Sequence, residues 1–167
     1  DVLVHIEDSF LDKYDFKKGS MSLIDEKQAE TLYSEIKNGL QTSGGSAANT
    51  ITGISQLGGN ASFIGRVRND YLGEVFTNDI KKAGAIFNTP YSTKGPSTAR
   101  CLIFVTADAE RTMCTYLGSS VLLDHQNLDL SIIKKSKILY LEGYLWDDNE
   151  AKKAFIKAVE ISKANGG

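Results

Sequence analysis

The spacing of hydrophobic and polar residues switches along the chain between helical and strand-like patterns. Between residues 26 and 38, apolar side chains recur every three to four positions, which predicts an amphipathic helix. Its apolar face consists of Ala29, Leu32, Tyr33, Ile36 and Leu40. Asp25 precedes this helix and Gln28 follows three residues later, the spacing of a capping box. Short apolar runs that predict strands occur at residues 2–6, 61–64, 86–88 and 138–142.

Three further helices are predicted from residues that suit helix starts and ends. The first begins after the two glycines near residue 45. The second begins at Asp70, an N-cap residue type, and ends at Gly84, which suits the left-handed conformation that follows a helix. The third begins at Asp147, which has Glu150 three residues later. Its predicted core face is Ala151, Ala154, Phe155, Ala158 and Ile161.

The segment 91–117 departs from this alternation of strands and helices. Residues 98–106 and 111–116 are rich in β-formers, and the turn-forming residues 107–110 join them, which predicts a hairpin. The remaining strand and helix alternation predicts a parallel sheet with right-handed crossovers, with the hairpin as an insertion. The expected fold class is therefore α/β. A chain of 167 residues can bury one sizeable core, so we expect one domain or a large part of one.

Composition excludes several classes of partner. The chain has 19 basic and 21 acidic residues, a net charge of −2, and its lysines occur in scattered pairs, so we expect no nucleic-acid partner. No run approaches the roughly 20 apolar residues that cross a bilayer, and no signal-peptide pattern is present. Two cysteines, Cys101 and Cys114, have neither disulfide-framework nor metal-site spacing. We expect a cytoplasmic protein with no membrane partner and no metal ligands of its own.

The small residues at 44–49 are the main candidate for a binding site. Gly44 and Gly45 let a ligand approach the backbone, and the helix that follows begins with N–H groups that lack intrahelical partners. Ser46 keeps the start small, and Asn49 adds a carbonyl acceptor and two N–H donors that could orient a diol. Glycines beside a helix start also serve close helix-to-strand packing. The spacing alone leaves both interpretations open.

Two charged residues lie where ligands are often bound. Glu142 ends an apolar run that is predicted to be a parallel strand, so it either contacts a polar ligand or is a surface or capping carboxylate. Arg111 begins the second hairpin strand and either holds an anion or pairs with Glu110 or Asp108. No Gly-x-x-x-x-Gly-Lys-Ser/Thr loop and no Gly-x-Gly-x-x-Gly turn occur, so the sequence supports neither a Walker-type nor a dinucleotide site.

Several motifs occur in an order that resembles a known family. They are Asp1, residues 44–49, Leu57-Gly58, residues 64–67, Asp70, Gly73 and residues 82–85. This order resembles the N-terminal half of the ribokinase-like (pfkB) carbohydrate kinases over nearly the whole chain. The resemblance implies part of a three-layer α/β/α core with a parallel sheet, and a small β-strand lid formed by residues 10–24 and 91–117. Residues 1–167 would form the substrate-binding part of one domain, without the family's C-terminal ATP-binding half.

The resemblance also implies an activity. Family members transfer the γ-phosphoryl group of ATP, with Mg²⁺, to a hydroxymethyl oxygen of a sugar or nucleoside. Arg111 resembles the lid arginine that reaches the transferred group, whereas the catalytic base aspartate is absent from these residues. The implied substrate-binding residues are Asp1, Gly44, Gly45, Ser46, Asn49, Glu142 and Tyr144. Pairing of two copies through the lid is an arrangement that the resemblance allows. A non-catalytic sugar- or nucleoside-binding module is the alternative function.

The residue after the two glycines bears on the substrate. Ser46 resembles the Gly-Gly-Ser-x-x-Asn form of adenosine kinases more than the Gly-Gly-Lys-Gly-Ala-Asn form of ribokinases. We therefore expect an adenosine kinase-like member that prefers a nucleoside such as adenosine over ribose or fructose. Tyr144 and the apolar lid residues Met21, Cys101 and Leu102 are expected to cover the base. The chain departs from the family's pattern at Ile51 and Arg68.

Overall fold

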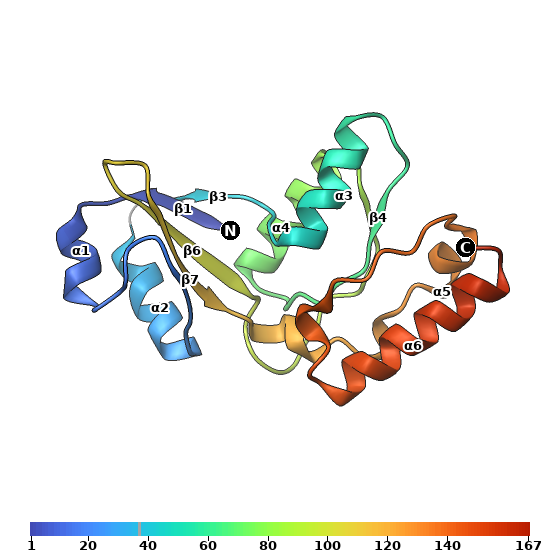
Figure 1. Ribbon diagram of the computed structural model, residues 1–167. Helices are drawn as coiled ribbons and strands as arrows, with labels where there is room; N and C mark the ends of the chain where they lie inside the picture. Colours follow the sequence, from blue (N-terminus) through green and yellow to red (C-terminus); the bar gives the residue numbers. More distant parts are fainter. Residues whose placement is uncertain (37) are drawn as a thin grey trace.

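The computed structural model spans residues 1–167 and describes residues 1–36 and 38–167. A sheet with helices on one face lies beside a region of helices and short strands (Figure 1). The sheet has five strands in the order β2-β7-β6-β1-β3. These strands are β1 (Val2–His5), β2 (Met21–Leu23), β3 (Leu40–Gln41), β6 (Arg100–Val105) and β7 (Arg111–Tyr116).

The five-stranded sheet is mixed. β6 and β7 form an antiparallel hairpin, β1 runs parallel to β6, β2 runs parallel to β7, and β3 is antiparallel to β1. Helices α1 (Asp8–Lys13) and α2 (Glu26–Glu35) cover one face of it (Figure 1). The cluster buried beneath them consists of Val2, Leu11, Leu32, Leu102, Phe104 and Cys114. Since successive strand residues point to opposite faces, their neighbours in sequence point to the other, partly exposed face.

The second region is built from βα units. The strands β4 (Ser62–Phe63) and β5 (Ile86–Phe87) are parallel, and α3 (Ser46–Gln56) and α4 (Tyr71–Lys82) accompany them. Its buried cluster consists of Ala48, Val67, Ile80, Ala85 and Phe87. Phe63, Phe76 and Phe87 contact one another with ring centroids 5.5–5.8 Å apart. This region therefore has an apolar core separate from that of the sheet.

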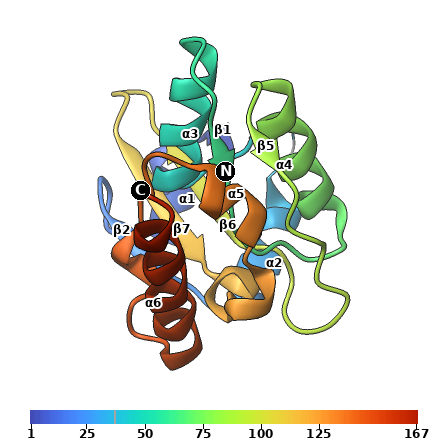
Figure 2. The ribbon, with the colours of Figure 1, turned by 90° about the vertical axis from the view of Figure 1, so that its right-hand side faces the viewer.

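The last third of the chain packs around one long helix. It contains the 3-10 helices η1 (Gly118–Leu122), η2 (His125–Asn127) and η3 (Gly143–Leu145), and the helices α5 (Leu130–Lys135) and α6 (Asn149–Ala164). Figure 2 shows α6 beside α5, and α6 also contacts η1 and η2. Its buried side is Ala151, Ala154, Phe155, Ala158 and Ser162. No helix of the described residues is both long and apolar enough to span a bilayer.

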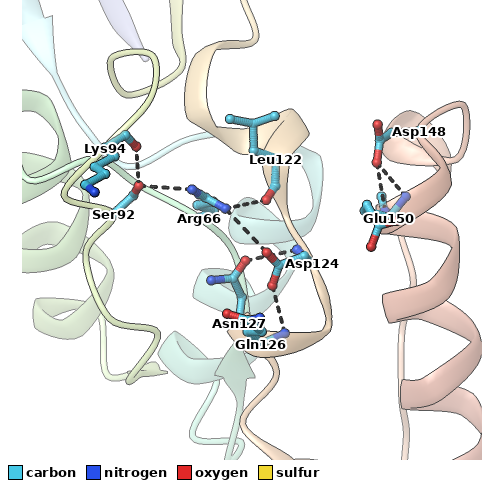
Figure 3. A network of polar contacts seen from close by, with 10 residues as sticks. Arg66, Ser92, Lys94, Leu122, Asp124, Gln126, Asn127, Asp148 and Glu150 are labelled. Atoms are coloured by element: carbon cyan, nitrogen blue, oxygen red, sulfur yellow. Dashed lines mark hydrogen bonds and ion pairs between the residues drawn. The ribbon is translucent and has the colours of Figure 1, made fainter.

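Arg66, in the turn after β4, joins three segments (Figure 3). Its guanidinium donates to the carbonyl of Leu122 at 2.6 Å and to Ser92 Oγ at 3.1 Å, and it lies 3.8 Å from the Asp124 carboxylate. Asp124 also accepts from the backbone N–H of Gln126 and so begins η2. The turn is therefore fastened to the start of the last third of the chain by polar contacts.

Predictions from local spacing are confirmed. Asp25 and Gln28 exchange both bonds of a capping box at the start of α2. Asp70 caps α4 by accepting from the backbone N–H of Gly73 at 2.8 Å. Gly84 follows α4 with φ of +96°, the left-handed conformation expected of it. The α/β class and the hairpin are also confirmed.

Two predicted helix boundaries and one predicted strand are wrong. The helix predicted over 26–38 ends at Glu35, because Ile36 has an extended backbone and Leu40 pairs in β3. Asp148, not Asp147, is the N-cap of α6, since its carboxylate accepts from the backbone N–H groups of Glu150 and Ala151. Residues 138–142 are not a strand: no described residue pairs with them in a ladder, and Ile138 is 84% exposed.

The predicted sheet arrangement also needs correction. Residues 2–6 were expected in the parallel sheet of the βα units, but β1 pairs with the hairpin strand β6 instead. The hairpin is therefore the centre of the largest sheet and not an insertion at its side. The parallel part of the βα region, among the described residues, consists of β4 and β5. The expected lid segment 10–24 is helical at its start, where it overlaps α1.

Candidate functional site

Glycine is required at positions 44 and 45, at the start of α3, for two different structural reasons. Gly45 is the N-cap, with φ of +94°, a conformation that disfavours any residue with a Cβ. Its carbonyl accepts from the backbone N–H of Asn49 at 2.9 Å. A Cβ on Gly45 would meet no atom within 4 Å, so the backbone conformation and not crowding requires glycine there. The space beside the first turn of α3 is open.

Gly44 lies against the Asp1 carboxyl group. A Cβ on Gly44 would overlap the carboxyl carbon and both carboxylate oxygens of Asp1. The backbones of Asp1 and Thr42 hold this approach, because Asp1 donates to the Thr42 carbonyl at 2.9 Å and Thr42 donates to the Asp1 carbonyl at 3.1 Å. The missing side chain therefore makes room for a carboxylate, and no helix-to-strand packing contact occupies its place.

Asn49 and Ser46 are exposed on the first turns of α3. Among the described residues, neither side chain takes part in a hydrogen bond within the protein. The amide of Asn49 therefore keeps both donors and its acceptor for another partner. Asp1 lies against Gly44, and Gly45, Ser46 and Asn49 follow Gly44 at the start of α3. We call these five residues the cradle.

A small cavity of about 20 Å³ lies beside Asp1, between the sheet and α4. This volume is room for about one water molecule. Polar lining comes from Asp1, Thr42, Thr98 and Arg100. Arg100 is only 9% exposed, its Nε and one Nη have no hydrogen-bond partner among the described residues, and its guanidinium lies 5.5 Å from the ring centroid of Tyr116. Sequence reasoning missed Arg100, since an arginine inside a strand carries no distinguishing spacing.

Arg111 lies far from the cradle. It pairs with Val105, which pairs with His5, whereas Asp1 precedes the opposite end of β1. At about 3.3 Å per residue, the four-residue offset along β7 separates the Arg111 row from the Asp1 row by about 13 Å. The two rows share a face of the sheet, because the offset is even.

The ion pair proposed for Arg111 is formed by a different cation. Asp108 pairs with Lys18 at 2.7 Å, and Lys18 also pairs with Asp8 at 2.6 Å. The ammonium of Lys18 and the Thr106 hydroxyl lower the pKa of Asp108 to about 2. Within residues 1–36 and 38–167, Arg111 makes no ion pair. Its exposed guanidinium therefore has no protein partner in this arrangement.

Glu142 and Tyr144 are not linked to the cradle by any hydrogen bond of the described residues. Glu142 precedes η3, and its carboxylate accepts from the Tyr140 hydroxyl at 3.0 Å, which raises the pKa of Tyr140. Tyr144 is 79% exposed. Their proposed contacts with substrate remain predictions. In the described part of the chain, no three His, Cys, Asp or Glu side chains cluster as metal ligands would.

The lid residues expected over a base do not share a face. Leu102 is fully buried in the cluster beneath α1 and α2. Cys101 points to the opposite face, where it accepts from the Thr115 hydroxyl at 3.4 Å. Adjacent strand residues cannot both face one ligand, so the prediction for Leu102 is wrong. Asp1, Cys101 and Thr115 lie in one row of the partly exposed face.

Known proteins resemble the chain in both sequence and structure. The structure of adenosine kinase from Sinorhizobium meliloti is 44% identical, with a TM-score of 0.86 over 99% of this chain and 50% of that one. That of a probable sugar kinase from Rhizobium etli CFN 42 is 41% identical, with a TM-score of 0.87 and the same coverage. Probable fructokinase-6, chloroplastic, from Arabidopsis thaliana is 32% identical over 125 residues, 74% of this chain and 33% of that protein.

The chain spans about half the length of the two structural relatives and a third of the plant protein. A family model described as pfkB family carbohydrate kinase matches residues 12–167. The match includes the start of α3, the turn after β4, the cap of α4 and the whole hairpin. The resemblance drawn from the motifs is therefore confirmed, and the chain belongs to the pfkB family of carbohydrate kinases.

Proposed function

We propose that this chain is the substrate-binding part of an ATP-dependent kinase that phosphorylates the hydroxymethyl group of a nucleoside or sugar. The observation that carries the proposal is the approach of the Asp1 carboxylate to Gly44, directly before the helix α3 that carries the exposed Asn49. An ionised carboxylate accepts strongly from two hydroxyls, and the amide adds a directional donor and acceptor. Such an arrangement suits a vicinal diol.

The chain's own residues bind and orient the acceptor in this proposal. Asp1 and Asn49 fix the sugar hydroxyls, and the backbone N–H groups at the start of α3 provide further donors. ATP supplies the phosphoryl group when bound, and Mg²⁺ would neutralise its phosphates. Among the described residues, no three His, Cys, Asp or Glu side chains cluster as metal ligands would.

The substrate proposed first is a nucleoside such as adenosine. The identity to the Sinorhizobium meliloti adenosine kinase, at 44%, supports it, as does Ser46. A partly exposed apolar row lies on the same sheet face as Asp1, two residues further along the strands. It consists of Leu3, Ile103 and Met113. A flat base could be buried against this row, which a free sugar would not use.

The activity is tested on the natural gene product that contains this sequence. Phosphotransfer from ATP with Mg²⁺ is measured with adenosine, ribose and fructose as acceptors. We expect the highest kcat/KM with adenosine. A clear preference for a free sugar would overturn the nucleoside assignment and retain the kinase. Binding of these compounds without any phosphotransfer would instead favour the non-catalytic binding module.

Arg111 is proposed to neutralise charge on the transferred phosphoryl group. Because its row lies about 13 Å from that of Asp1, this role requires the sheet to close over the substrate. Arg111→Ala should lower kcat roughly tenfold or more and leave the acceptor KM nearly unchanged. A raised acceptor KM with an unchanged kcat would make Arg111 a substrate-binding residue instead.

Pairing of two copies through the lid also remains a proposal, which sedimentation of the natural gene product tests.

A further inference from the structure

Asp79, on α4, holds the segment that leads into the cradle. Its Oδ2 accepts from the backbone N–H of Ser43 at 2.7 Å and from the Ser43 and Thr42 hydroxyls at 2.8 Å each. Three donors from two consecutive residues therefore converge on one carboxylate oxygen. Ser43 is buried, so its N–H has no water to replace Asp79.

The position of Asp79 is not explained by the helix that carries it. Asp70 caps the start of α4, whereas Asp79 lies in the last turn, where its carbonyl accepts from the N–H of Ala83. A carboxylate at a helix C-terminus faces the negative end of the helix dipole, which is unfavourable. Lysines, as at Lys82, are the residues that suit this turn. The hydrogen bonds with Thr42 and Ser43, and not a role within α4, therefore account for an acidic residue at position 79.

The charge state of Asp79 fits this assignment. Burial opposes its ionisation, but the hydrogen bonds from Ser43 and Thr42, together with the charge of Lys82, outweigh burial and lower its pKa. Asp79 is therefore an ionised acceptor at neutral pH, and hydrogen bonds to a charged acceptor are the stronger kind.

The two residues that Asp79 holds connect both sides of the cradle. Thr42 exchanges two backbone hydrogen bonds with Asp1, and Ser43 precedes Gly44, against which the Asp1 carboxylate lies. A shift of Thr42 would move Asp1, and a shift of Ser43 would move the glycines. We propose that Asp79 is a positioning residue that fixes the Asp1 carboxylate relative to the start of α3 without contacting the substrate. This inference rests on the proposed function.

The experiment compares three variants of the natural gene product that contains this sequence. Asp79→Ala removes all three acceptor bonds, and Asp79→Asn keeps an oxygen that accepts them. Asn78→Ala is the matched control, because Asn78 is the exposed neighbour on α4 and makes no hydrogen bond to the cradle. The readouts are hydrogen exchange of the amides in residues 42–49, and KM for adenosine, for fructose and for ATP.

Asp79→Ala should accelerate exchange of the Ser43 amide about tenfold or more and raise the acceptor KM by a similar factor, with the KM for ATP unchanged. Asp79→Asn should recover most of both effects, and Asn78→Ala should match the wild type. A merely structural role would lower thermal stability and leave the acceptor KM unchanged, which would overturn the proposal. Unchanged exchange at Ser43 would overturn it as well.

Two further outcomes keep the proposal testable. If Asp79→Ala does not fold, Thr42→Val removes one donor with little change of shape and should raise the acceptor KM by a smaller factor. If the wild type transfers no phosphate, the proposed function fails, and dissociation constants for adenosine and fructose replace KM. Hydrogen exchange still decides then whether Asp79 holds the segment. Failure of the kinase assignment and failure of the Asp79 assignment are thus distinguishable.

Discussion

The five-stranded sheet and the βα region are stabilised by different kinds of contact. In the sheet, the six-residue strands β6 and β7 pair along their whole length, and Phe104 is fully buried beneath α1 and α2. In the βα region, each strand has two residues. Polar side chains of this region form hydrogen bonds with segments next to the sheet. Asp70 and Asp79 of α4 each bind a segment that belongs to the sheet side.

The candidate site lies between these two regions. Asp1 belongs to the start of β1, whereas the glycines and Asn49 belong to the start of α3. Neither apolar cluster includes a cradle residue. The polar contacts of α4, in contrast, act directly on Thr42 and Ser43, the two residues that precede Gly44. Stability and site geometry should respond to different substitutions.

The largest expected effect comes from comparing the two cores directly. Phe104→Ala should lower the free energy of unfolding by about 3–5 kcal/mol, because it leaves a cavity in the closed cluster beneath α2. Phe87→Ala should have a smaller effect if the shorter strands of the βα region relax around it. Urea unfolding followed by circular dichroism measures both. Equal losses from the two variants would contradict the contrast between the regions.

A polar contact between the regions should matter almost as much. Asp70 accepts from Gly73 N–H and from both the N–H and hydroxyl of Thr98, at 2.7–2.8 Å. Asp70→Ala removes a helix cap and leaves the backbone N–H of the buried Thr98 without its acceptor, at a cost of about 2–4 kcal/mol in unfolding free energy. Asp148→Ala is the control, since it removes only a cap and should cost about 1 kcal/mol. Similar losses from the two would mean that the Thr98 contact contributes little.

Substitution in the cradle should lower activity and leave stability nearly unchanged, in contrast to the substitutions above. If Asn49 binds substrate hydroxyls as proposed, Asn49→Ala removes these directional bonds and should raise the barrier expressed in kcat/KM by about 1–3 kcal/mol, roughly one to two decades. The unfolding midpoint should hardly change, because the Asn49 side chain is exposed and unbonded within the described protein. Steady-state kinetics and thermal unfolding of one preparation decide it. Full activity with lost stability would favour a packing role for the cradle.

The smallest expected effect concerns the sheet core in alkali. Burial first, and then the nearby Cys101, raises the pKa of the Cys114 thiol to about 11. A raised folded pKa means that the contribution of Cys114 is fully present below its unfolded value of 9.0 and is lost as the pH rises towards 11. The free energy of unfolding measured in urea should therefore fall over this pH range more for the wild type than for Cys114→Ala. Parallel curves for the two proteins would contradict the assignment.

Local spacing predicted the parts of the fold that depend on local chemistry. The capping bonds of Asp25 with Gln28 and of Asp70 with Gly73, and the left-handed backbone of Gly84, each act within four residues along the chain, so these roles could be inferred without knowledge of the rest. The partner of β1 could not, because the pairing of Val2 with Leu102 joins residues a hundred positions apart and leaves no periodic trace. The apolar run at 138–142 predicted a strand, but a strand also needs a neighbour.

The candidate site divides in the same way. The motif placed Gly44 and Asp1 at one site, and the structure brings them into contact. Asp79 could not be inferred, because its partners Thr42 and Ser43 are nearly forty residues away. Its acidic side chain in a helix among lysines looks like ordinary surface charge. Long-range polar contacts of this kind become visible only with the register of the elements.

The chain segments that link the five-stranded sheet to the βα region and to the last third of the chain leave the sheet at one end. The segment after β3, the segment before β6 and the segment after β7 lie at the Asp1 end, and the hairpin turn at 107–110 is at the other (Figure 1). In the proposed closure of the sheet over a substrate, the pivot would lie beside Asp1 and the moving end near Arg111. A rotation of about 30° at the pivot carries the Arg111 row by about 7 Å, given the separation of about 13 Å between the rows. Asp1 would hardly move in such a rotation, so the ligand contact proposed for Asp1 would not depend on whether the sheet is open or closed.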